Sequence, residues 1–148
     1  MIAAGKVLIM GLPGAGKTTL AQARVPRLGA VHFNADAARQ NVNKELGFSL
    51  DDRIEQARRM GWLCDRVVEA GYVAVADFVC PPPETREAFG RAFVIWMDRI
   101  WECRFADTNR VFVRPADYQV RVLPQGSAEE WAEAIEARYR DWADAQQK

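Results

Sequence analysis

The sequence lacks the features that mark membrane, secreted and metal-stapled proteins. No apolar run is long enough to cross a membrane, and the first residues do not form the basic and apolar regions of a signal peptide. The three cysteines, Cys64, Cys80 and Cys103, follow no zinc-site spacing and indicate no disulfide pairing. Repeats and low-complexity tracts are also absent, and 148 residues are an ordinary length for one domain. We therefore expect a cytoplasmic protein with a single domain over residues 1–148 and no membrane partner.

A net charge is missing as well. Lys+Arg and Asp+Glu number 20 each, which gives a formal net charge of +0 at pH 7. Without an excess of positive charge, no overall field attracts the chain to nucleic acid, although a local basic groove would still permit binding. With 49% hydrophobic and 27% charged residues, the composition is that of a folded domain with a hydrophobic core.

What the sequence does contain is a regular alternation of short apolar runs and helical stretches. This alternation predicts an α/β fold with a five-stranded, largely parallel sheet flanked by helices. The expected strands cover residues 6–10, 30–34, 72–77, 92–97 and 118–123. The expected helices lie near residues 17–25, 36–43, 50–70 and 83–89, and a last helix follows Ser127.

Two of these helices begin with clear capping signals. Ser49 precedes the long helix at 50–70, and Ser127 with Glu130 forms a capping box before the last helix. The last helix also carries a stripe of large side chains at helical spacing: Trp131, Ile135, Tyr139 and Trp142. Such a stripe is typical of a helix packed on a core, and packing is favoured here over a base-stacking surface.

The most informative segment, residues 11–19, reads GLPGAGKTT. It follows an apolar run and precedes a helical stretch, which is the context of the phosphate-binding loop G-x-x-x-x-G-K-[ST]. The glycines let backbone N–H groups surround a phosphate, Lys17 reaches the β- and γ-phosphates, and the Thr18 hydroxyl binds Mg²⁺. A glycine-rich turn that binds nothing is the weaker alternative. The segment predicts ATP and Mg²⁺ as cofactors, with ATP bound by Gly11, Gly14, Ala15, Gly16, Lys17, Thr18 and Thr19.

Two carboxylates follow predicted strands, at the edge of the sheet where ligands bind in open α/β folds. Asp36 comes just after the second strand and is a candidate to orient or deprotonate an acceptor hydroxyl, or to cap the next helix. Asp77 ends the third strand and is a candidate Mg²⁺ ligand, through water, together with Thr18.

Further residues resemble the acceptor-site signature of adenylylsulfate kinases. Asn34-Ala35-Asp36 and Arg39 are similar to the D-G-D-x-x-R motif of that family, and Phe78-Val79-Cys80-Pro81 is similar to its F-I-S-P motif. Between them, the stretch NKELGFS at 43–49, followed by Asp52-Arg53, matches the family's L-G-F-S and D-R elements. The resemblance implies a P-loop kinase with strand order 2-3-1-4-5. Its reaction would be transfer of the ATP γ-phosphate to a hydroxyl of a nucleotide-like acceptor.

Carried over position by position, the resemblance implies a set of substrate-binding residues. Arg39 and Arg53 match residues that contact the anionic part of the acceptor, and guanidinium groups bind phosphate or sulfate through paired hydrogen bonds. Phe48 matches an aromatic residue of the acceptor pocket. A solvent-exposed helix face explains the neighbouring arginines at 58–59 equally well. The full set is Asp36, Arg39, Phe48, Arg53, Gln56, Phe78, Val79 and Cys80.

The chain departs from the family pattern mainly on the acceptor side. Asn34 replaces an acid, Gln56 an asparagine and Cys80 a serine, and Asp77 stands where the family carries a small residue. After the fourth strand the family has a long basic lid, whereas this chain has a shorter candidate lid at about residues 99–116.

The candidate lid still offers side chains for closure over a nucleotide. Its arginines are Arg104, Arg110 and Arg114, and Arg104 is the predicted catalytic one, beside Lys17 and Asp36. Either Phe105 or Phe112 is a candidate for stacking on a base. An exposed surface loop is the alternative interpretation of this segment.

The acceptor is the part that the sequence leaves open. A small-molecule nucleotide, adenylyl sulfate, is the first hypothesis because the L-G-F-S and D-R elements belong to its kinases. A shorter lid would also admit a polynucleotide, through a 5′-hydroxyl end or a hydroxymethylated base in DNA. Asn34, Asp36 and Arg39 are similar to the N-x-D-x-x-R region of phage-type polynucleotide kinases. A non-catalytic nucleotide-binding switch is the third possibility, and the oligomeric state is not predicted.

Overall fold

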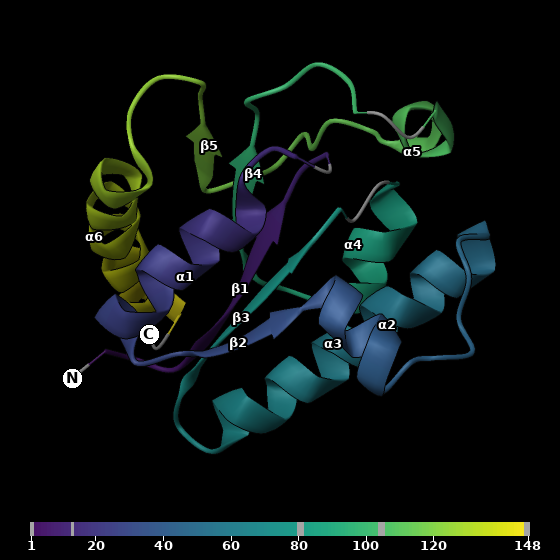
Figure 1. Cartoon of the computed structure of the whole chain (residues 1–148). Helices are drawn as coiled ribbons and strands as arrows, with labels where there is room; N and C mark the ends of the chain where they lie inside the picture. The colour runs from purple at the N-terminus through teal and green to yellow at the C-terminus, as the bar shows by residue number, and fades with distance from the viewer. Residues whose placement is uncertain (1, 13, 80–81, 104–105, 147–148) are drawn as a thin grey trace.

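The computed structural model describes residues 2–12, 14–79, 82–103 and 106–146. Five parallel strands form one sheet in the order β2-β3-β1-β4-β5, as predicted (Figure 1). The strands are β1 (Gly5–Met10), β2 (Val31–Asn34), β3 (Val73–Phe78), β4 (Phe93–Met97) and β5 (Val120–Val122). The central strands β1 and β3 are buried along their whole length because helices cover both faces of the sheet.

Five helices occupy the predicted places, and a sixth was not predicted. They are α1 (Lys17–Leu28), α2 (Ala35–Asn41), α3 (Leu50–Glu69), α4 (Pro83–Phe89), α5 (Ala106–Val111) and α6 (Ala128–Gln146). Helix α1 runs beyond the predicted residue 25 and ends before Gly29, whose φ of 60° suits a helix end. Helix α5 lies in the segment predicted as a lid, and its six residues are too few to show a helical period.

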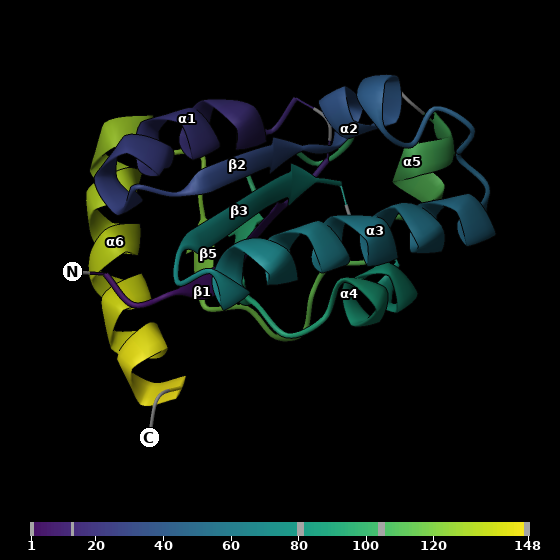
Figure 2. The same ribbon diagram turned by 90° about the horizontal axis from the view of Figure 1, so that it is seen from below.

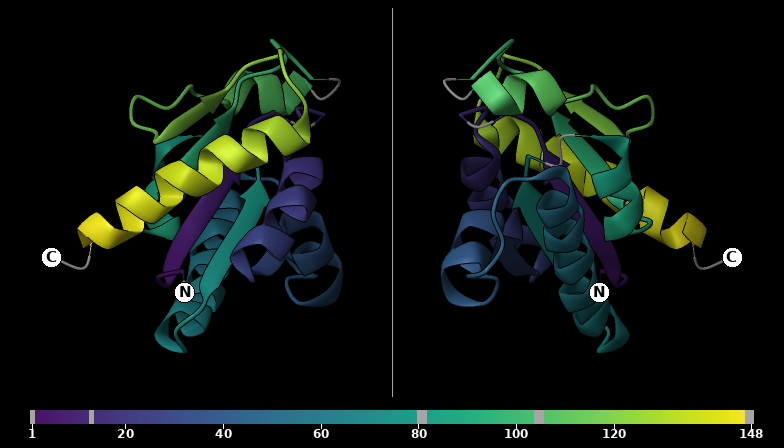
Figure 3. Two further views of the ribbon diagram at one scale, coloured as in Figure 1. Left: turned by 90° about the vertical axis from the view of Figure 1, so that its left-hand side faces the viewer. Right: turned by 90° about the vertical axis from the view of Figure 1, so that its right-hand side faces the viewer.

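Alternate side chains of β1 point into two separate cores. Val7 and Ile9 face the side covered by α1 and α6, whereas Leu8 and Met10 face the side covered by α3 and α4. Figure 2 shows the sheet edge-on between α1 and α3, and the left panel of Figure 3 shows α6 lying across α1. This two-layer covering leaves the carboxyl ends of the strands, with their loops, as the place for a ligand.

The capping signals are confirmed at both helices. Ser49 Oγ accepts a hydrogen bond from the Asp52 backbone at 3.1 Å, and Ser127 Oγ accepts one from Glu130 at 3.2 Å. The stripe on α6 packs on the core, as favoured, because Tyr139 is fully buried with its ring against Phe93.

None of the helices in the described ranges is long and apolar enough to cross a membrane.

Candidate active site

The phosphate-binding loop joins β1 to α1 at the carboxyl end of the sheet, where its backbone must turn sharply. Gly14 and Gly16 have φ values of 89° and 94°, in the left-handed region that favours glycine. A β-carbon at Gly11 would lie 2.8 Å from the carbonyl oxygen of Met97, at the end of β4. The loop therefore requires glycine twice for its turn and once for its close approach to β4.

Lys17 begins α1 with its side chain folded into the loop. Its ammonium group donates a hydrogen bond to the carbonyl oxygen of Leu12 at 3.0 Å, and the residue is buried. Burial lowers the pKa of Lys17 from 10.5 to about 8, and the charges of Asp77 and Asp36 oppose this shift in part. The ammonium group thus lies inside the loop under the influence of two carboxylates, and its acceptor among the described residues is a neutral carbonyl oxygen that an anionic ligand can replace.

Asp77 is the centre of a polar network between β2, β3 and α1. The residue is 2% exposed, and its Oδ1 atom accepts hydrogen bonds from Thr18 Oγ1 at 3.2 Å and from Asn34 Nδ2 at 3.0 Å. Its Oδ2 atom is bonded to Nε2 of His32. Three donors from two elements, α1 and β2, therefore satisfy a carboxylate that would otherwise be costly to bury.

The donor set fits a magnesium ion that also binds phosphate. In the described part of the chain, no group of three or more His, Cys, Asp and Glu side chains gathers to hold a metal. Thr18 and Asp77 are nevertheless adjacent at the first turn of α1. Because Mg²⁺ is commonly held by one or two protein oxygens together with substrate phosphates, this pair is sufficient only when a nucleotide is present.

Asp36 is exposed in the first turn of α2, and it is not the helix cap. The cap is Asn34, whose side chain accepts a hydrogen bond from the Ala37 backbone at 3.0 Å. The capping alternative for Asp36 is therefore wrong, because Asn34 occupies that position in the chain. Burial lowers the pKa of both Lys17 and Arg39, and the charge of Asp36 opposes this lowering in part at each of them.

Phe48 lies exposed between two arginines. The guanidinium group of Arg39 is 4.4 Å from the centre of the Phe48 ring, and that of Arg53 is 5.6 Å from it. Arg39 donates to the carbonyl oxygen of Gly47 at 2.6 Å, and Arg53 donates to that of Phe48 at 2.9 Å. Phe48 is 68% exposed, so its ring is accessible to a ligand. The three predicted acceptor residues therefore form one surface, which we call the Phe48 platform.

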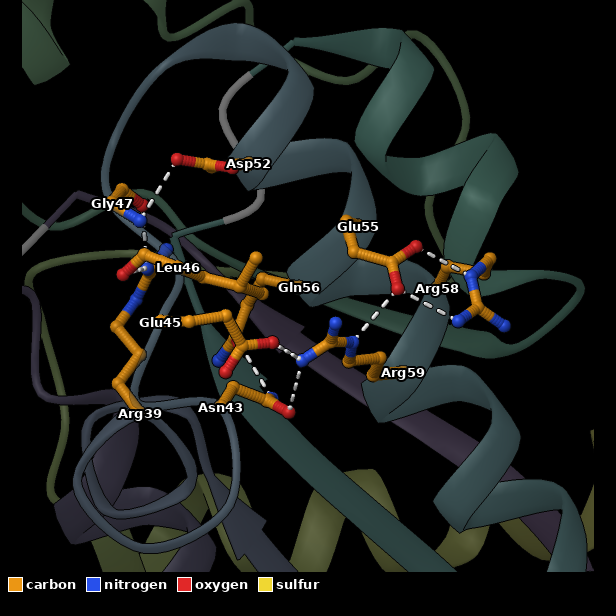
Figure 4. Close-up of polar contacts among 10 residues, drawn as sticks. All are labelled: Arg39, Asn43, Glu45, Leu46, Gly47, Asp52, Glu55, Gln56, Arg58 and Arg59. Carbon is orange, nitrogen blue, oxygen red and sulfur yellow. Dashed lines mark hydrogen bonds and ion pairs between the residues drawn. The ribbon is translucent and has the colours of Figure 1, made fainter.

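Gln56 lies among the polar contacts drawn in Figure 4, where it is bonded to Asn43. It is 2% exposed, its carbonyl accepts from Asn43 at 2.7 Å, and its amide donates to Ala35 at 3.2 Å. Both ends of the amide are thus used inside the protein, so the prediction that Gln56 contacts the acceptor does not fit its position. Its place, four residues before the buried Met60, is on the inner face of α3.

The arginines at 58–59 hold this region together through ion pairs. Arg58 pairs with Glu55, and Arg59 pairs with Glu55 and Glu45 (Figure 4). Their hydrogen bonds lower the pKa of Glu55 to about 2. Arg59 also donates to Asn43 at 3.2 Å, so it connects the loop before α3 to the helix itself. Part of the sequence signature therefore serves the shape of the loop.

The remaining predicted residues are placed as follows. Phe78 is buried, with its ring 5.6 Å from that of Phe89, so it contributes to the core under α4 and not to an open surface. Val79 is half-buried just beyond β3. Cys80, Arg104 and Phe105 lie outside the described residues.

The segment predicted as a lid is held in shape by hydrogen bonds within it. The side-chain amide of Asn109 accepts from the backbone nitrogen of Cys103 and donates to its carbonyl oxygen, both at 2.8 Å. Arg114 stacks on the exposed ring of Trp101, with its guanidinium carbon 4.9 Å from the ring centre. Phe112 lines a small pocket with Leu12 of the phosphate-binding loop, so the segment does reach the nucleotide end of the site.

Comparison with known proteins shows where this arrangement belongs. The sequence profile of the adenylylsulphate kinase family matches residues 4–108. The chain belongs to this family. The adenylyl-sulfate kinase of Oceanobacillus iheyensis is 38% identical over 82 residues, which cover 52% of this chain and 41% of that protein. The adenylyl-sulfate kinase of Shewanella pealeana is 42% identical over 82 residues, which cover 52% of this chain and 40% of that protein. The chain thus matches less than half the length of these curated relatives.

Solved structures have the same fold as this chain at low sequence identity. The APS kinase of Mycobacterium tuberculosis, solved in complex with AMPPNP and APS, has a TM-score of 0.80 at 21% identity and covers 93% of this chain and 98% of its own. The crystal structure of APE1195 has a TM-score of 0.84 at 17% identity, covering 97% and 98%. These likenesses show the P-loop kinase fold.

One residue of the site was missed by sequence reasoning. His32 is the single histidine of the chain and precedes Asn34 by two positions on the predicted second strand. Residues two apart on a strand face the same side, so the spacing of His32 and Asn34 indicates that both side chains can reach one neighbour. That neighbour, Asp77, is far away in the sequence, and only the strand order identifies it.

Proposed function

We propose that this protein is an ATP- and Mg²⁺-dependent kinase that phosphorylates a hydroxyl of a nucleotide-like acceptor, with the 3′-hydroxyl of adenylyl sulfate as the preferred one. The observation that carries the proposal is the place of Asp36 in the first turn of α2. This short helix begins after Asn34, which is hydrogen-bonded to Thr18 and Asp77, and it carries Arg39 of the Phe48 platform. A carboxylate in that position can accept or orient the hydroxyl proton as the γ-phosphate is transferred.

The residues divide into a nucleotide half and an acceptor half. The loop amides and Lys17 hold the β- and γ-phosphates, and Thr18 with Asp77 would hold Mg²⁺. When bound, the ion neutralises charge on the phosphates. Phe48 offers its exposed face to a planar base, and the guanidinium groups of Arg39 and Arg53 attract the anionic part of the acceptor.

Nucleotide binding should depend on pH through Lys17. The pKa of this lysine is lowered to about 8, and phosphates favour its charged form. Affinity should therefore be greatest below pH 8 and fall by up to about tenfold for each pH unit above it, with uptake of a proton on binding. Titration calorimetry at pH 9, in two buffers of different ionisation enthalpy, measures this uptake. The variant Lys17→Arg should bind the nucleotide without proton uptake, because arginine stays charged at pH 9. An equal binding heat in both buffers for the natural protein would contradict the prediction.

The acceptor is tested by transfer of labelled γ-phosphate from Mg·ATP to adenylyl sulfate, a 5′-hydroxyl oligonucleotide and DNA that contains hydroxymethyl pyrimidines. We expect label on adenylyl sulfate, because the Phe48 platform joins one aromatic face to two cationic groups and so matches one base with one anionic group. Label on an oligonucleotide instead would keep the kinase and replace its acceptor. Nucleotide binding with no label on any acceptor would favour a non-catalytic switch.

Two arginine variants serve as matched controls for the acceptor. Arg39→Ala removes a guanidinium group from the Phe48 platform and should raise KM for adenylyl sulfate about tenfold or more with little change in KM for ATP. Arg58→Ala removes one that pairs with Glu55 on the outer side of α3, and it should leave both values within about twofold. Equal effects of the two substitutions would mean that the Phe48 platform does not bind the acceptor.

A further inference from the structure

We propose that His32 is a positioning residue that holds the carboxylate of Asp77 in the orientation needed at the metal site. The proposal rests on the proposed function, because it concerns the same Mg²⁺–nucleotide site. It assigns a role to a residue that belongs neither to the phosphate-binding loop nor to the Phe48 platform.

The strand register brings the participants together. Strands β2 and β3 are parallel neighbours, and Asn34 lies directly opposite Asp77. His32 is two residues earlier on β2, opposite Val75, so its side chain leaves the same face of the sheet as that of Asn34. Helix α1 covers this face and brings Thr18 to Asp77 from above the sheet.

The directions of the hydrogen bonds make each partner specific to one oxygen. The side-chain oxygen of Asn34 accepts from the Ala37 backbone, so its amide nitrogen must be the atom that faces Oδ1 of Asp77. Thr18 donates to the same Oδ1 atom. The other oxygen, Oδ2, is bonded to Nε2 of His32. An ionised carboxylate only accepts hydrogen bonds, so Nε2 carries the hydrogen.

This division fixes the rotation of the carboxylate about its last bond. With Oδ2 held by His32, Oδ1 stays directed at the Thr18 hydroxyl, which is the other protein oxygen predicted at the metal. Without the histidine donor, the oxygen of a 2% exposed carboxylate would lack its partner, and the group would turn to share the donors of Oδ1. Partners that orient metal ligands in this way commonly change metal affinity by 10- to 100-fold.

The test compares three substitutions of His32 by their binding of Mn²⁺, measured by electron paramagnetic resonance in the presence of a non-hydrolysable ATP analogue. Glutamine places its amide nitrogen near the position of Nε2, whereas asparagine is too short to reach and leucine has no donor. We expect His32→Gln to keep the Kd for Mn²⁺ within about twofold, and His32→Asn and His32→Leu to raise it about tenfold. Affinity for the analogue without metal should stay within about twofold in all three.

The outcomes separate the positioning role from simple packing and from the proposed function. If His32→Leu binds Mn²⁺ like the natural protein, or if glutamine weakens binding as much as asparagine, the positioning role is overturned. If leucine prevents folding, the comparison of glutamine with asparagine still decides. If the natural protein binds neither the analogue nor Mn²⁺ with it, the proposed function fails before His32 is tested.

Discussion

Replacing Lys17 by alanine should lower the rate of phosphoryl transfer by about a thousandfold or more, which corresponds to about 4 kcal/mol of lost transition-state stabilisation. The ammonium group lies inside the phosphate-binding loop, 3.0 Å from the Leu12 carbonyl oxygen, a neutral partner that a phosphate can replace. Removing it leaves charge that develops on the transferred phosphate without its nearest protein cation. The rate is measured with labelled γ-phosphate and the best acceptor of the panel.

The same substitution should leave the fold intact. Burial disfavours the charged form of Lys17 in the free protein, so loss of the ammonium group removes an unfavourable interaction together with one hydrogen bond. Thermal unfolding of Lys17→Ala should therefore occur within a few degrees of the natural protein. Lys17→Arg is the matched variant that keeps the charge and changes its geometry. Unchanged transfer by Lys17→Ala would refute the nucleotide site itself.

Local patterns were sufficient for most of the fold. The apolar runs predicted every strand within about two residues at either end, and the capping residues Ser49 and Ser127 marked two helix starts correctly. The strand order came from the resemblance to adenylylsulfate kinases, because periodicity alone does not say which strands are neighbours. Helix α5 was missed since it is shorter than two helical turns.

The site was predicted less completely because much of it depends on contacts between distant segments. Gln56 was predicted to bind the acceptor, yet α3 turns it toward Ala35 and Asn43, where a buried amide must be bonded at both ends. In the same way, the resemblance alone did not indicate that Phe78 would pack against Phe89. A motif names the residues that occur together, and the packing decides which of them face a ligand.

Asp77 shows what is gained by combining the sequence prediction with the strand order of the structure. The sequence placed a carboxylate at the end of the third strand, and the sheet order set it beside Asn34, the position at which the resemblance to adenylylsulfate kinases implies an acid. One negative charge is thus provided from β3 in this chain, with His32 and Asn34 as its donors.

Replacing Asp36 by asparagine should lower phosphoryl transfer by about a hundredfold, the usual contribution of a positioned general base, and leave nucleotide binding unchanged. Asn34 caps α2, so the substitution at Asp36 costs the helix only a favourable charge in its first turn, about 0.3–1 kcal/mol. A structural explanation for a large loss of activity is thereby removed. The measurement is kcat with adenylyl sulfate, beside Mn²⁺ binding in the presence of the ATP analogue.

Asp77→Asn is the informative contrast to Asp36→Asn, because both remove one carboxylate near Lys17. Asp77 is bonded to Thr18, so its loss should weaken Mn²⁺ binding, whereas Asp36→Asn should bind Mn²⁺ normally and fail at transfer. Such a division would assign the two carboxylates to the two halves of the site. A rate for Asp36→Asn within about twofold of the natural protein, a shift of only ~0.4 kcal/mol, would mean that Asp36 takes no part in the reaction.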